Sequence, residues 1–132
     1  MILVDTSVIV AWLDPDHDHH MVCEQALLHW AELDHLAVSS VTFAELAAGG
    51  RTRESVEEVL EGFERVDLGF SDSWRAGMAF GRFPKSKTKT VLPDFFIRAQ
   101  AAVRDWRHLS NDDRRLAPWH DVNFIFVRPR KS

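Results

Sequence analysis

The chain opens with Met1-Ile2-Leu3-Val4-Asp5-Thr6-Ser7, the stretch that decides the fold. Four consecutive apolar residues bounded by a polar cluster predict a strand buried on both faces of a parallel sheet. Asp5 stands where this strand ends, and Thr6 or Ser7 is expected to cap the helix that follows. Because ligands bind beyond the carboxyl ends of strands in open α/β sheets, Asp5 is a candidate site residue. The alternative is that Asp5 only turns or caps the chain.

Length and composition limit the classes of protein. The chain has 132 residues, of which 45% are hydrophobic, and this suits one domain covering residues 1–132. The single cysteine, Cys23, cannot form an internal disulfide, which favours a reducing cytoplasm. The sequence has no signal-peptide pattern and no apolar run long enough to cross a membrane. We therefore expect a soluble cytoplasmic protein.

Charge is unevenly distributed along the chain. Residues 1–81 contain 15 acidic and 4 basic residues, a net charge of −11, whereas residues 82–132 contain 5 acidic and 12 basic residues, a net charge of +7. This asymmetry indicates either a polyanionic partner on the C-terminal side or a set of solvated basic side chains.

Apolar patterns of strand and helix type alternate along the sequence. Four further strands are predicted. They lie at 36–39, at 65–68, in the segment just before Asp112, and at 122–127. One helix is predicted to begin at Val8, and a longer one, after the polar segment 14–20, to end at about Leu33. Further helices are predicted around 41–47 and at 53–63, 70–83 and 93–103. The alternation predicts an α/β fold, a three-layer α/β/α sandwich with a central parallel sheet.

Four carboxylates occupy special positions in this pattern. They are Asp5 at a strand end, Glu45 in an apolar helical turn, Asp94 directly after Pro93 at a helix start, and Asp112 after a strand. Simpler explanations exist, because Asp94 could offset the helix dipole and Glu45 could face solvent. Loops after successive parallel strands lie at one edge of a sheet, however, so the four positions can converge. Converging carboxylates repel one another, and Mg²⁺ or Mn²⁺ would relieve the repulsion and activate a water for attack on a phosphodiester.

Three other polar segments are candidates for the site or for its ligands. Ser7 is expected to support the acids through its hydroxyl. The segment 14–20 is rich in His and Asp, and offers either metal ligands or ordinary helix caps. Lys85, Lys87 and Lys89 alternate in a predicted loop, where they would either contact phosphates or only keep the loop soluble.

Four ordered segments resemble PIN-domain ribonucleases, in particular the VapC-type toxins of bacterial toxin–antitoxin pairs. The segments are Val4-Asp5-Thr6-Ser7, Ser39-Ser40-Val41-Thr42-Phe43-Ala44-Glu45-Leu46, Leu92-Pro93-Asp94-Phe95-Phe96-Ile97 and Leu109-Ser110-Asn111-Asp112. The resemblance covers nearly the whole chain and implies a flavodoxin-like arrangement of the sandwich. It implies that Asp5, Glu45, Asp94 and Asp112 bind Mg²⁺ or Mn²⁺ and cleave RNA. It also implies a homodimer neutralised by a VapB-type antitoxin, which would place a basic side chain in the acidic pocket.

The sequence departs from the family pattern in two places. Phe95-Phe96-Ile97-Arg98 is bulkier than usual and places a cation one turn beyond Asp94. The strand before Asp112 is less apolar than usual, and Asp113 is an immediate alternative to Asp112 as the fourth acid. Arg114 and Arg115 are expected either to contact RNA phosphates or to be solvated.

Two other functions are weighed against the nuclease. Phosphoryl transfer with Asp5 as nucleophile would need a second aspartate two residues on, where this chain has Ser7. A catalytically silent PIN-like module that binds RNA or protein is the non-enzymatic alternative, and the presence of all four acids argues against it.

Overall fold

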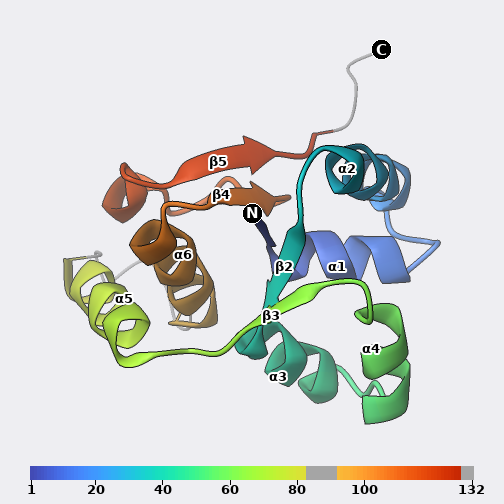
Figure 1. Ribbon diagram of the computed structural model, residues 1–132, viewed down its shortest axis with the longest axis horizontal. Coiled ribbons are helices and arrows are strands. Elements are labelled where there is room, and N and C mark those ends of the chain that lie inside the picture. The colour runs from blue at the N-terminus through green and yellow to red at the C-terminus, as the bar shows by residue number, and fades with distance from the viewer. Residues whose placement is uncertain (83–91, 129–132) are drawn as a thin grey trace.

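Five parallel strands form the central sheet, in the order β3-β2-β1-β4-β5 (Figure 1). The computed structural model describes residues 1–82 and 92–128 of the chain. The strands are β1 (Ile2–Val4), β2 (Leu36–Ser39), β3 (Glu64–Val66), β4 (Arg107–Ser110) and β5 (Asn123–Phe126). The α/β fold with a central parallel sheet is therefore confirmed.

Helices cover both faces of the sheet. They are α1 (Thr6–Leu13), α2 (His20–Leu33), α3 (Ser40–Ala48), α4 (Arg53–Val59), α5 (Phe70–Arg82) and α6 (Leu92–Arg104), and a 3₁₀ turn, η2, spans Ala117–Trp119. Helices α5 and α6 lie on one side of the sheet, and α1, α2 and α4 lie on the other (Figure 1). This arrangement gives the three layers of the predicted sandwich.

Strand β1 is the centre of the core because its side chains alternate between the two faces. Ile2 and Val4 belong to the apolar cluster on the α1 and α2 side, whereas Leu3 packs with Ile97 of α6 on the other. All three residues of β1 are fully buried. Strand β1 pairs with β2 on one side and with β4 on the other, and Val4 lies opposite Leu109.

The direction of winding reverses between β1 and β4. From β1 the chain proceeds through β2 to β3 at one edge, and then crosses through α5 and α6 to β4, on the opposite side of β1. Such a reversal is the usual place of a ligand site in an open α/β sheet. Asp5 directly follows β1, and the turn beginning at Asn111 directly follows β4.

Local details differ from the sequence predictions. Asp5 itself caps α1 by accepting a hydrogen bond from the Ser7 amide at 3.0 Å, so the predicted caps, Thr6 or Ser7, were wrong. Helix α4 ends at Val59 rather than at 63, and Leu60 is its C-cap. Gly62 disfavours a further helical turn by about 1 kcal/mol. No helix in residues 1–82 and 92–128 is long and apolar enough to cross a membrane. The predicted loop with Lys85, Lys87 and Lys89 lies outside the described residues.

Strand β4 is expected to contribute strongly to stability because it holds the turn that follows it against β1. Leu109 of β4 is fully buried, whereas Leu28 of α2 is 64% exposed. Leu109→Ala should lower the free energy of unfolding in urea by about 3 kcal/mol through lost burial and a residual cavity. The matched control Leu28→Ala should change it by less than about 0.5 kcal/mol. Equal effects of the two substitutions would contradict the described packing of β4.

Candidate functional site

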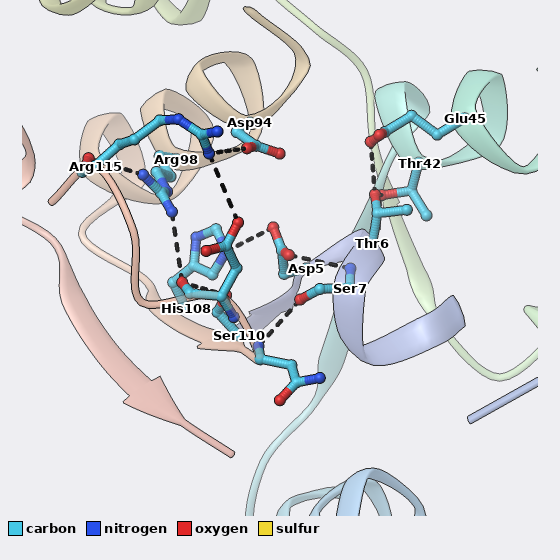
Figure 2. Close-up of polar contacts among 12 residues, drawn as sticks. Asp5, Thr6, Ser7, Thr42, Glu45, Asp94, Arg98, His108, Ser110 and Arg115 are labelled. Carbon is cyan, nitrogen blue, oxygen red and sulfur yellow. Dashed lines mark hydrogen bonds and ion pairs between the residues drawn. The ribbon is translucent and has the colours of Figure 1, made fainter. Parts of the chain in front are cut away.

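Asp5 is held in one orientation by two partners at the end of β1. Its Oδ2 accepts the hydrogen bond from the Ser7 amide, and its Oδ1 lies 3.3 Å from Nε2 of His108 (Figure 2). Burial opposes ionisation of Asp5, but His108 and Ser7 outweigh this effect and keep its pKa below the ordinary value. Asp5 is therefore a buried carboxylate that stays ionised.

Glu45 of α3 lies on the opposite side of Asp5 from His108 (Figure 2). Its Oε1 accepts a hydrogen bond of 2.8 Å from the Thr6 hydroxyl, which also lies 2.9 Å from the Thr42 hydroxyl. Burial raises the pKa of Glu45, and the negative charges of Asp94 and Asp5 raise it further, against the opposing Thr6 bond. Among the described residues, the donor to this carboxylate is a hydroxyl group and not a basic side chain.

Asp94 stands in the first turn of α6, and its side chain faces the same space as that of Asp5 (Figure 2). Burial raises the pKa of Asp94, and the charges of Asp5 and Asp112 add to the rise, while Arg98 and Arg115 oppose it. Nη1 of Arg115 lies 3.6 Å from Asp94 Oδ2. The charged form of Asp94 is thus destabilised, and Arg98 and Arg115 offset only part of this destabilisation.

Asp112 is held by the arginine two residues later. Its Oδ1 accepts hydrogen bonds from the backbone amide and Nε of Arg114, at 3.0 and 2.9 Å, and its Oδ2 accepts one from Nη2 at 3.1 Å. Arg115 Nη1 lies 4.0 Å from the same Oδ2. Burial would raise the pKa of Asp112, but Arg114 outweighs it and the pKa is lowered.

The turn that carries Asp112 is tied to α1. The hydroxyl of Ser7 accepts a hydrogen bond of 3.0 Å from the Asn111 amide, and that of Ser110 accepts one of 3.0 Å from the Asp112 amide. Ser7 therefore supports the site twice, through its amide on Asp5 and through its hydroxyl on this turn.

Arg98 and His108, which were not predicted as site residues, lie beside these acids (Figure 2). Arg98 is only 2% exposed, and its Nη1 donates a hydrogen bond of 2.9 Å to the Arg115 carbonyl. Burial lowers the pKa of Arg98, against the charges of Asp5, Asp94 and Asp112. His108 is fully buried, and its Nδ1 has no hydrogen-bond partner among the described residues. The sequence signal that could have identified them was a polar residue within an otherwise buried segment, in α6 for Arg98 and in β4 for His108.

Asp5, Glu45, Asp94 and Asp112 form one electrostatic group, which we call the acidic cluster. The charge of Asp5 shifts the pKa of Glu45 and of Asp94, and Asp112 also shifts that of Asp94. The adjacent Asp113 instead pairs with Arg128 at 2.8 Å and lies outside the cluster. Within the described ranges, 1–82 and 92–128, no three His, Cys, Asp or Glu side chains lie close enough to form a ready-made metal site. This result covers both the cluster and the His-rich segment 14–20.

Comparisons with known proteins agree on one family. The family model described as PIN domain matches residues 2–118. Ribonuclease VapC10 of Mycobacterium tuberculosis is 33% identical over 132 residues, covering 98% of this chain and 92% of that protein.

Two solved structures share the fold at low sequence identity. VapBC2 from Rickettsia felis, bound to a DNA fragment from its promoter, has a TM-score of 0.76 at 16% identity and covers 97% of this chain and 100% of that chain. VapC20 of Mycobacterium tuberculosis, a sarcin-ricin loop cleaving toxin, has a TM-score of 0.71 at 18% identity and covers 98% and 100%. With the family model and the VapC10 relative, these findings show that the chain belongs to the PIN-domain family.

Proposed function

We propose that this protein is a Mg²⁺- or Mn²⁺-dependent endoribonuclease that acts as a toxin. The observation that carries the proposal is the acidic cluster, in which four carboxylates from distant segments share one electrostatic field at the reversal point of the sheet. The VapC10 relative, which spans almost the whole chain, is named a ribonuclease. PIN-domain VapC ribonucleases generally depend on a divalent metal.

The chemistry of the cluster fits a hard divalent cation. Carboxylate oxygens are the ligands that Mg²⁺ and Mn²⁺ prefer. Burial raises the pKa values of Glu45 and Asp94, neighbouring carboxylates raise them further, and a bound cation would favour the charged forms of both acids. We propose Asp5, Glu45, Asp94 and Asp112 as the ligands. When bound, such an ion activates water and stabilises the leaving oxygen of a phosphodiester.

The chain's own groups would orient three oxygens of the proposed ligands before this ion binds. Ser7 and His108 fix the two oxygens of Asp5, and Thr6 fixes Glu45. Such supporting contacts limit the rotamers of the carboxylates and reduce the entropy lost on binding. RNA would be bound through its phosphates by basic side chains near the cluster, for which we propose Arg114, Arg115, Lys85, Lys87 and Lys89.

A VapB-type antitoxin is the partner that we propose, acting on a toxin homodimer in the cytoplasm. Two of the solved structures with this fold are named as VapBC assemblies, from Rickettsia felis and from nontypeable Haemophilus influenzae. A basic antitoxin side chain that entered the acidic cluster would compete for the negative potential that recruits the metal.

A silent PIN-like module is the second candidate. The observation in its favour is that Arg114 and Arg115 already pair with Asp112 and Asp94. Calorimetric titration with Mn²⁺ separates the two functions, because a module without a metal site should give no heat that depends on the carboxylates.

Removal of one charge from the cluster should abolish most activity. Asp5→Asn and Asp94→Asn should each lower the rate of cleavage of structured RNA in Mg²⁺ by at least about 100-fold, because each loses a charged ligand while keeping its size. Asparagine also caps helices well, so Asp5→Asn should keep α1 intact. Undiminished cleavage by both variants would rule out the proposed site.

The neighbouring aspartates should differ in their effect on activity. Asp112→Asn should reduce RNA cleavage about as much as Asp94→Asn does, whereas the matched variant Asp113→Asn should stay within about twofold of wild type. The reason is that Asp112 belongs to the cluster and Asp113 pairs with Arg128 at the surface. Larger loss in Asp113→Asn than in Asp112→Asn would reverse the assignment of the fourth ligand.

Glu45 and Asp94, whose pKa values are raised by folding, should destabilise the chain when no metal is bound. The pKa of Glu45 is higher in the folded chain than its ordinary value, so its charged form is disfavoured by folding. The penalty is absent below the unfolded pKa of about 4.3, grows as the pH rises through the folded pKa, and is complete above it. Glu45→Gln should therefore raise the free energy of unfolding in EDTA at pH 7 by a few tenths to about 1 kcal/mol.

The gain from Glu45→Gln should fade as the pH falls to about 4. Urea titrations at several pH values measure the effect, with Glu32→Gln on the exposed face of α2 as the control. Lower stability of Glu45→Gln at pH 7 in EDTA would contradict the described electrostatics.

A further inference from the structure

We infer that Arg114 and Arg115 exchange partners during the working cycle: they neutralise Asp112 and Asp94 in the metal-free chain, and bind RNA phosphates once a divalent cation occupies the acidic cluster. This inference rests on the proposed function and deepens it. It makes metal binding and RNA binding mutually reinforcing, since a coupling between two sites is reciprocal.

The contacts of Arg114 leave no oxygen of Asp112 unengaged. Nε binds Oδ1 and Nη2 binds Oδ2, a two-pronged pair of the kind that guanidinium forms with planar anions. The Arg114 side chain is nevertheless 67% exposed, so it can leave Asp112 without disturbing the core. A metal ion that took an oxygen of Asp112 would weaken this pair.

Arg115 lies between two acids of the cluster. Its Nη1 is 3.6 Å from Oδ2 of Asp94 (Figure 2). The same Nη1 is 4.0 Å from Oδ2 of Asp112. A divalent cation held by the same two carboxylates would be a like charge within a few ångströms of this guanidinium. Two like charges at such a short distance repel each other. Metal and Arg115 therefore compete for one location.

The backbone of the turn is held separately from these side chains. Arg115 has a φ of 57°, a left-handed conformation that costs free energy for a residue other than glycine. The buried Arg98 holds this conformation by donating to the Arg115 carbonyl at 2.9 Å. Because Arg98 contacts the backbone, the side chain of Arg115 can swing away while the turn keeps its place beside the cluster.

Phosphate is the ligand that best fits the released groups. Guanidinium matches phosphate oxygens in the same two-pronged way as it matches a carboxylate. The turn follows β4 directly and adjoins Asp5 at the reversal point of the sheet. A phosphodiester held at the cluster would lie within reach of both arginines.

The inference predicts opposite effects of one substitution on two ligands. Arg115→Gln removes the competing charge, so Mn²⁺ should bind about three- to tenfold more tightly in calorimetry. The same variant should bind short single-stranded RNA more weakly in Mn²⁺, and the dependence of the binding constant on salt should fall by about one ion. A purely structural role of Arg115 would weaken both ligands. Arg114→Gln, at an exposed position, should repeat the pattern if Arg115→Gln fails to fold.

Two further variants complete the design. Arg115→Lys keeps the charge and should stay near wild type in Mn²⁺ affinity, whereas Arg128→Gln removes an equivalent charge that pairs with Asp113 and should leave Mn²⁺ affinity unchanged. In wild type, RNA should bind more tightly in Mn²⁺ than in EDTA, by anisotropy with RNA shown to be intact on a gel. This gain should shrink in Arg114→Gln and Arg115→Gln.

Failure of the inference is distinguishable from failure of the proposed function. Wild type that binds Mn²⁺ at the acids, with no tighter binding in either arginine variant, would overturn the partner exchange and leave the metal site standing. Wild type that binds no Mn²⁺ would overturn both. Weaker binding of both Mn²⁺ and RNA in Arg114→Gln and Arg115→Gln would assign the arginines to the structure of the turn alone.

Discussion

Repulsion among the carboxylates of the acidic cluster is the constraint on which the rest of the site depends. The parallel sheet places the ends of β1 and β4 side by side, and α3 and α6 add Glu45 and Asp94 from either side. The fold thus gathers charges that would separate in an unfolded chain. Hydroxyl and amide donors orient these carboxylates, and Arg98, Arg114 and Arg115 offset their charge. Each of these contacts reduces the cost of gathering the acids without removing their negative potential.

Most of the fold could be predicted from sequence because its decisive strands are buried on both faces. In β1 and β2, burial on both faces requires a continuous apolar run, and such runs are visible without knowledge of the partners. Helix ends were less predictable, since α4 stops four residues before its apolar pattern does. The prediction of the residue that caps α1 was wrong for a similar reason. Thr6, Ser7 and Asp5 can all cap a helix, and only the backbone conformation decides which of them does so.

The acids of the proposed site were predicted from the sequence, but the side chains that contact them were not. A carboxylate at a strand end has a position that follows from topology alone. His108 lies beside Asp5 only because β4 pairs with β1 in one register, in which Leu3 lies opposite His108, and no local pattern fixes that register. Arg98 was noted as an irregularity of α6, yet its contact with the turn after β4 depends on how two distant segments pack. Whether the four acids bind metal stays a prediction.

The internal arginines also bear on how the protein can be controlled. A cluster with a surplus of negative charge attracts any cation that can reach it, whether a metal, a side chain of the same chain, or a side chain of a partner. Arg114 and Arg115 are tethered beside the acids, so they act at a high effective concentration but with weak, partly exposed contacts. On the proposed function, a divalent ion would displace such contacts through its greater charge. A partner that blocked the site would then have to outcompete the metal, and a buried basic side chain supported by an extended interface would do so where Arg114 and Arg115 would not.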